Sequence, residues 1–308
     1  MVVRDKPNAF RLFFTLRGSI VPKILPQILF VALLGAGVAI AQHYLPPLLP
    51  DYSPFAFTVL GVALSLFLGF RNNACYERWW EARKQWGQLL VDGRSLARQA
   101  NAFLDDEVEG AAEAKKRLVH LTIAFTHALR HQLRQTNGWS EIEPYLQAED
   151  HERLQRSQNL PDCLLQLLGQ ELGRCRRQGL LSDILIQNFD ERITSMAGVL
   201  AACERIQNTP LPFAYMLLVH RTAYIYCLLL PFGVVSALGA FTPLLCAIVA
   251  YTFFGLDALS EELEEPFGLS SNDLPLSAMS RTLEINLLEA IGETELPPAL
   301  KPTGHCLQ

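Results

Sequence analysis

Charged residues are scarce in this chain: they make up 19% of its 308 residues, whereas 50% are hydrophobic. That balance exceeds the apolar content of most soluble domains and raises the question of whether the excess is concentrated in a few segments. The sequence also has no excess of basic over acidic residues, because the formal net charge is −5, and its lysines and arginines are scattered. We therefore expect no nucleic-acid partner.

The common catalytic motifs are absent from the sequence. It contains no Gly-rich phosphate loop, no H-E-x-x-H and no G-x-S-x-G. Its 7 cysteines form no C-x-x-C pair, which argues against disulfides and against a zinc site. We expect neither an enzyme nor a bound cofactor or metal.

Three histidines, His120, His127 and His131, fall on roughly one face of an expected helix. Three imidazoles on one helix face can together bind a metal ion. No acidic fourth ligand stands out at the same spacing, so we interpret them as the polar or subunit-facing stripe of an amphipathic helix.

Four long apolar stretches hold the hydrophobic excess, at residues 24–41, 54–70, 211–238 and 240–259. A helix needs roughly 17 to 25 residues to cross ~30 Å of hydrocarbon, so each stretch is long enough to span a membrane. The polar lead-in before the first stretch is long for a signal peptide, which favours a retained anchor.

The basic residues indicate the orientation of these helices. Arginines and lysines precede the first stretch and fill the long middle segment, but they are absent from the two short connections. By the positive-inside rule, the N-terminus, the middle segment and the C-terminus are cytoplasmic. The expected parts are a cytoplasmic N-terminal segment 1–23, two transmembrane helices in 24–70, a cytoplasmic helical domain 71–210, two transmembrane helices in 211–259 and an acidic cytoplasmic C-terminal segment 260–308.

The middle segment is predicted to be helical, because apolar residues recur at helical spacing in 113–135 and 161–178. Ser182 suits the N-cap of a third helix that runs to about Asn208. The polar segment 136–160 reads as loop with short helical pieces. Strand-like alternation is nearly absent, so the fold class is an all-α membrane protein.

The second apolar stretch contains two parallel strips. Gly61, Ser65 and Gly69 repeat every four residues and would let neighbouring helices approach closely. Val62, Leu66 and Phe70 repeat at the same spacing with larger side chains. Several copies of this helix around an axis would form a hydrophobic constriction that gates ions by dewetting. The alternative is an ordinary lipid-facing or core strip.

His220 and Arg221 are ionisable residues inside the third apolar stretch. Such groups often face protein or a water-filled cavity. They lie close to the expected cytoplasmic start of the stretch, where an arginine can extend to the interface, so we favour a structural role.

The end of the second apolar stretch and the residues that follow it form a specific sequence motif. The run F-L-G-F-R-N-N-x-x-Y-x-R-W-W-E-x-R-K-x-W-G, at residues 67–87, resembles the signature of the bestrophin family, especially its bacterial members. Two further motifs, at 210–215 and 266–268, support the resemblance. It covers nearly the whole chain, about residues 10–290.

The resemblance implies a homopentameric ion channel with four transmembrane helices per subunit and one central pore. Its partners would be copies of itself, membrane lipid and permeating monovalent ions, in a bacterial inner membrane. In that family the second transmembrane helix lines a neck with three apolar rings, and these positions match Val62, Leu66 and Phe70. A cytoplasmic aperture is expected at Ile184, with Leu180 and Leu181 as fallbacks.

One departure from the family concerns calcium. Animal bestrophins follow the Pro-Phe-Gly motif with an acidic run that forms part of a calcium clasp, whereas residues 269–273 contain a single carboxylate. We expect a channel that calcium does not activate. The glutamates just upstream, Glu261, Glu262, Glu264 and Glu265, are interpreted as a solvated helix face.

Ion selectivity would depend on charges at the two mouths of the pore, because apolar rings discriminate poorly by sign. Asp51 and Asp183 would each become a ring of carboxylates in a pentamer, which favours cations such as sodium and potassium, as the resemblance to bacterial members also suggests. Either aspartate can instead be an ordinary loop or first-turn residue. The alternatives are a chloride channel, as in animal bestrophins, and a membrane-anchored scaffold or signalling protein.

Overall fold

The computed structural model describes residues 1–3, 8, 10, 15–16, 18–44 and 53–308. Within these residues the regular structure is helical, and the only β-type pairings are isolated bridges that join Cys306 to Val2 and to Thr303. The expected all-α fold is confirmed. Asp51 lies outside the described residues.

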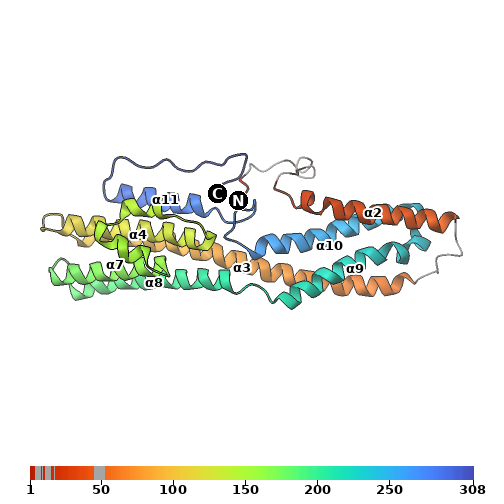
Figure 1. The fold of residues 1–308 in the computed structure, drawn as a ribbon, viewed down its shortest axis with the longest axis horizontal. Helices are drawn as coiled ribbons and strands as arrows, with labels where there is room; N and C mark the ends of the chain where they lie inside the picture. The colour runs from red at the N-terminus through yellow and green to blue at the C-terminus, as the bar shows by residue number, and fades with distance from the viewer. Residues whose placement is uncertain (4–7, 9, 11–14, 17, 45–52) are drawn as a thin grey trace. The chain divides into compact units, whose positions relative to one another are not determined.

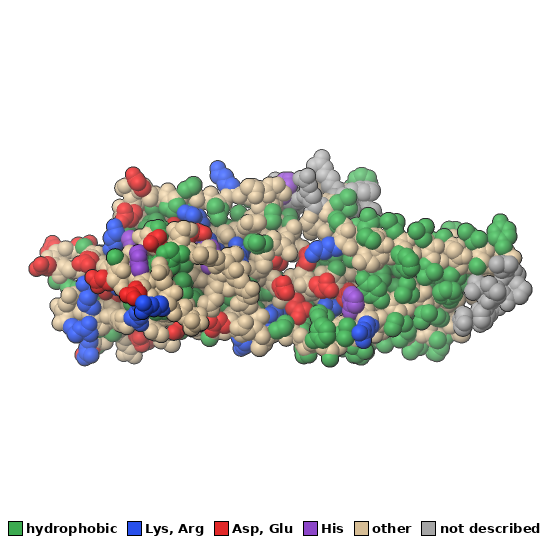
Figure 2. All heavy atoms as spheres, in the orientation of Figure 1, with side chains coloured by type: hydrophobic (Ala, Val, Ile, Leu, Met, Phe, Trp, Pro, Cys, Tyr) green, Lys and Arg blue, Asp and Glu red, His purple; other side chains and the backbone are tan. Residues whose placement is uncertain are grey.

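The chain forms two compact units. One consists of Arg4–Trp79 and Pro210–Pro266, and we call it the apolar unit. The other consists of Met1–Val3, Trp80–Thr209 and Phe267–Gln308, and we call it the polar unit. Figure 2 shows apolar side chains gathered over α2, α9 and α10, and charged side chains gathered over α4, α7 and α8.

The apolar unit contains α2 (Val21–Tyr44), the first part of α3 (Pro54–Phe103), α9 (Phe213–Leu238), the 3-10 helix η3 (Gly239–Phe241) and α10 (Thr242–Glu264). These helices lie side by side in Figure 1 and share one buried cluster to which each α-helix contributes, for example Val31, Leu64, Cys227 and Phe254. The helical stretches long and apolar enough to cross a membrane are Val21–Tyr44, Pro54–Phe103 and Phe213–Glu264, the last of which comprises α9, η3 and α10.

Helix α3 is longer than the apolar stretch that begins it. The hydrophobic residues end at Phe70, but the helix continues without a break to Phe103. The sequence explains this, because the residues after Phe70 include good helix formers and contain no proline. The expected boundary between residues 70 and 71 therefore falls inside one helix.

The polar unit is built from helices that the sequence largely anticipates. They are the second part of α3, α4 (Ala111–Arg134), α5 (Trp139–Ile142), η2 (Glu143–Tyr145), α6 (Ala148–Gln155), α7 (Leu160–Arg177), α8 (Asp183–Asn208) and α11 (Leu276–Ala290). Ser182 caps α8 by accepting a hydrogen bond from the Leu185 amide at 3.4 Å. Gly179, just after α7, has a φ of 73°, which glycine adopts without strain.

The cysteines are all free thiols, and each of them except Cys306 is buried. Burial raises the pKa of the Cys175 thiol to about 11 and that of the Cys203 thiol to about 12. At neutral pH these side chains are protonated thiols with little nucleophilic reactivity.

Candidate functional site

Three apolar side chains form an exposed strip on α3. Val62 and Leu66 are each 58% exposed and Phe70 is 64% exposed. Because a helix turns by about 100° per residue, side chains four apart lie nearly above one another. We call Val62, Leu66 and Phe70 the exposed strip.

The opposite face of α3 packs into the apolar unit. Its buried residues are spaced three and four apart and comprise Gly61, Leu64, Leu68, Arg71 and Cys75. At about 100° per residue, this set is centred about 180° from the exposed strip. The strip therefore points away from the subunit's own core, toward lipid or another chain.

The small residues of the same stretch do not share one environment. A Cβ added at Gly61 would lie 2.6 Å from the Tyr226 hydroxyl of α9, so this glycine allows a close helix approach inside the subunit. The Ser65 hydroxyl donates to the Gly61 carbonyl at 2.8 Å. A Cβ at Gly69 would meet nothing within 4 Å. Packing of Ser65 and Gly69 against a neighbouring subunit stays a prediction.

A buried charge pair follows the exposed strip directly. Arg71 has no exposed surface, and its Nη1 donates to Oδ1 of Asp257 on α10, which is 4% exposed. The other oxygen of Asp257 lies 2.6 Å from Nδ1 of His220 on α9. The pair and the histidine thus connect three helices of the apolar unit.

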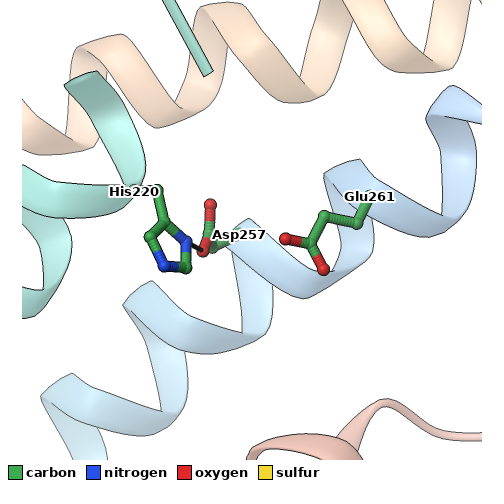
Figure 3. Close-up of side chains that lie close together, drawn as sticks. All are labelled: His220, Asp257 and Glu261. Atoms are coloured by element: carbon green, nitrogen blue, oxygen red, sulfur yellow. Dashed lines mark hydrogen bonds and ion pairs between the residues drawn. The ribbon is translucent and has the colours of Figure 1, made fainter. Parts of the chain in front are cut away.

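We define the charged cluster as Arg71, His220, Asp257 and Glu261, and Figure 3 shows the last three of these residues. His220 points from α9 toward Asp257, and Glu261 lies one turn further along α10. His220, Asp257 and Glu261 each offer a ligand atom within 4.8 Å of the others, which is the only such group among the residues described. In this structure the positive charge beside Asp257 is the Arg71 guanidinium.

Sequence reasoning noticed His220 but not its pairing. Asp257 lies 186 residues from Arg71 and 37 from His220, so no local pattern connects them. The available signal was an arginine directly after one apolar stretch and an aspartate inside another, since buried charges require partners. Arg221, the neighbour of His220, is exposed, as an arginine that extends to an interface would be.

The three histidines of α4 contact side chains of neighbouring elements in the polar unit. His127 Nε2 lies 3.1 Å from Glu284 of α11, and His131 Nε2 lies 3.2 Å from Glu141. His120 packs edge-on against Tyr145, with ring centroids 5.3 Å apart. Burial lowers the pKa of His120 and of His131. Each histidine therefore joins α4 to a neighbouring element.

Glu284 is the centre of a hydrogen-bonded group in the polar unit. The Tyr145 hydroxyl donates to its Oε1 at 2.6 Å, while its Oε2 lies near His127. Burial raises the pKa of Glu284, but the hydrogen bonds from His127 and Tyr145 outweigh this effect, so the pKa is lower than usual.

The candidate aperture residues differ in exposure. Ile184, the second residue of α8, is 77% exposed, whereas Leu181 is buried and Leu180 is half-buried. Asp183 begins α8 and pairs with Nε of Arg176 at 2.6 Å. A cation therefore lies beside this carboxylate, in an exposed ion pair.

The glutamates before the Pro-Phe-Gly motif are only partly solvated, so the expected solvated face is wrong for two of them. Glu262 pairs with Lys23 at 2.6 Å, and its side chain is mostly buried. Glu264 is buried and accepts a hydrogen bond from the Leu211 amide at 3.1 Å. These contacts join α10 to the first turn of α2 and to the segment before α9. Asp273 is also buried, and it accepts from the Ser270 amide at 2.6 Å.

Long apolar helices, most of whose apolar side chains remain exposed, define a helical membrane protein with several candidate spans. The chain belongs to the bestrophin family, because the family model described as "Bacterial/Fungal Bestrophin protein" matches residues 1–289. The resemblance stated from the motif at residues 67–87 is confirmed.

Relatives of known name and structure match over almost their full length. A protein of Mesorhizobium japonicum named a voltage-dependent anion channel-forming protein is 46% identical over 98% of this chain and 95% of its own length. One of the same description from Escherichia coli is 40% identical over 99% of both chains. The crystal structure of a bacterial bestrophin homolog from Klebsiella pneumoniae is similar with a TM-score of 0.84 and 39% identity, covering 88% of this chain and 100% of that chain.

Proposed function

We propose that this chain is the subunit of a homopentameric bestrophin-type ion channel that passes small monovalent ions passively. The observation that carries the proposal is the exposed strip of α3, which points away from the subunit's own core at the positions expected for the neck. The family relationship supports it, since close relatives are named as channel-forming proteins.

In this proposal the strip of each copy faces a common axis. Val62, Leu66 and Phe70 then form three apolar rings, which conduct when wet and block ions when dry. The exposed Ile184 forms the second constriction, at the cytoplasmic aperture. Four helices, namely α2, the first part of α3, α9 and α10, cross a bacterial inner membrane with both termini in the cytoplasm. Calcium does not activate the channel.

The permeant ions are proposed to be cations, mainly sodium and potassium, with Asp51 and Asp183 as candidate mouth charges. A second candidate is an anion channel, which the names of the relatives favour. The ion pair between Asp183 and Arg176 also weakens the contribution of Asp183 to cation preference.

A reversal-potential measurement in asymmetric sodium chloride tests both statements. The purified protein, fused into a planar bilayer, should carry current, and the sign of the reversal potential identifies sodium or chloride as the permeant ion. The absence of current from pentameric protein would contradict the channel.

The size of the particle in detergent separates the channel from a membrane-anchored scaffold. A pentamer is required for the proposed pore, because one copy of α3 cannot enclose an axis. A strictly monomeric particle in detergent and in lipid nanodiscs would favour the scaffold.

A further inference from the structure

Glu77 lies on the same side of α3 as the exposed strip. It follows Phe70 by seven residues, almost two full turns, so the two side chains leave the helix within about 20° of each other. The rise between them is about 10 Å along the helix axis. Both residues are exposed, and both belong to the apolar unit. A carboxylate therefore continues the face that carries the strip.

The Glu77 side chain has a hydrogen-bond partner but, among the described residues, no ion-pair partner. Asn73, also exposed and one turn earlier, donates its Nδ2 to Oε1 of Glu77 at 2.9 Å. Among the described part of the chain, no lysine, arginine or histidine forms an ion pair with Glu77. Asp183 differs in this respect, because Arg176 lies 2.6 Å from its carboxylate.

We infer that Glu77 is the residue that gives the pore its preference for cations, an inference that rests on the proposed channel. In a pentamer, each copy contributes one carboxylate to a ring immediately on the cytoplasmic side of the apolar rings. Uncompensated charge at a narrow passage raises the local concentration of ions of the opposite sign and repels the others. Phe70 controls passage, and Glu77 selects the sign of the ion.

Glu77→Gln tests this role with little structural disturbance. The glutamine keeps an Oε1 acceptor for Asn73 and loses only the charge. The full-length channel in a planar bilayer with asymmetric sodium chloride should lose cation preference, with the sodium-to-chloride permeability ratio falling by about threefold or more. Glu77→Asp keeps the charge and should keep a ratio close to that of the unsubstituted protein.

Two control variants separate this ring from other carboxylates. Asp183→Asn tests the other candidate mouth charge, and it should lower the ratio less than Glu77→Gln does, because Arg176 lies 2.6 Å from the Asp183 carboxylate. Glu152→Gln removes an exposed carboxylate of α6 that pairs with Arg156, and it should change neither current nor ratio. A ratio unchanged in Glu77→Gln, or one that falls in Asp183→Asn alone, overturns the inference.

The same measurements distinguish failure of the inference from failure of the channel. No current from unsubstituted pentameric protein overturns the proposed function itself. A current with the same ion preference in Glu77→Gln and in the unsubstituted protein leaves the channel intact and overturns only the role of Glu77. Because the Debye length falls from about 10 Å at 0.1 M salt to about 3 Å at 1 M, the effect of the charge should also shrink at high salt.

Discussion

The guanidinium of Arg71 is fully buried and donates to the carboxylate of Asp257, joining the residue directly after the exposed strip of α3 to the middle of α10. Two of its nitrogens, Nε and Nη2, have no hydrogen-bond partner among the described residues. The ion pair is therefore the main compensation for a charge with no access to water.

Replacing Asp257 should destabilise the apolar unit strongly. Asp257→Ala leaves the Arg71 charge buried and unpaired, which costs about 3–5 kcal/mol. Thermal unfolding of the detergent-solubilised protein measures the loss. The double variant Arg71→Met, Asp257→Leu removes both charges and should recover most of the stability. Equal stability of the single variant and the unsubstituted protein would contradict the importance of the pair.

Two leucines of α3 provide a matched test of the neck. Leu66 lies on the exposed strip, whereas Leu68 has no exposed surface. Leu66→Ala should change single-channel conductance while leaving the fold of the subunit intact. Leu68→Ala should instead cost about 2–5 kcal/mol of stability, because it opens a cavity in the core. Phe70→Ala should behave like Leu66→Ala, and unchanged conductance in both would count against the neck assignment.

Because α3 and α9 approach closely at Gly61, we expect the stability lost by a substitution at Gly61 to be partly restored by a substitution at Tyr226. In Gly61→Ala the new methyl group would meet the Tyr226 hydroxyl at 2.6 Å, so the tyrosine must move. We expect a loss of about 1–3 kcal/mol, measured by thermal unfolding. Tyr226→Phe removes that hydroxyl and should restore part of the stability in the double variant. Gly69→Ala is the control within the subunit, since its added methyl group meets nothing.

We expect Glu284 to make a pH-dependent contribution to the stability of the polar unit. Its pKa is lower in the folded protein than in the unfolded chain, because hydrogen bonds from His127 and Tyr145 outweigh the effect of burial. Such a group stabilises the fold above its unfolded pKa, and this stabilisation is lost as the pH falls through the folded pKa.

The variant Glu284→Gln should therefore be less stable by about 1–3 kcal/mol at neutral pH. The difference from the unsubstituted protein should narrow as the pH falls below about 4. Unfolding followed by circular dichroism across this pH range measures both quantities. Glu152→Gln, at an exposed ion pair, should stay within about 0.5 kcal/mol at every pH. A difference that grows on acidification would contradict the role of the ionised carboxylate.

The parts of the fold that the sequence predicts are those with local causes. The helix that begins after Ser182 follows from a capping side chain, and the end of α7 follows from Gly179, because these signals act within a few residues. The continuation of α3 beyond Phe70 was missed, since a hydropathy pattern marks where apolar residues end and not where a helix ends.

The residues of the candidate site also fall into two groups, those that the local sequence predicts and those that depend on contacts between distant segments. The spacing of Val62, Leu66 and Phe70 already defines one helix face, which is why periodicity alone selects them. The pairing of Arg71 with Asp257 and the burial of Glu264 depend on contacts between segments far apart in sequence. Only the packed structure brings those segments together.

The burial of the cysteines has a practical consequence. Apart from Cys306, no thiol of the chain is accessible, and Cys175 and Cys203 are almost entirely protonated at neutral pH. A variant with Cys306→Ser is therefore a nearly silent background for maleimide or methanethiosulfonate labelling. Single cysteines introduced at positions 62, 66, 70 and 77 can then be modified one at a time from either side of the membrane, which maps the ion pathway chemically without reference to current.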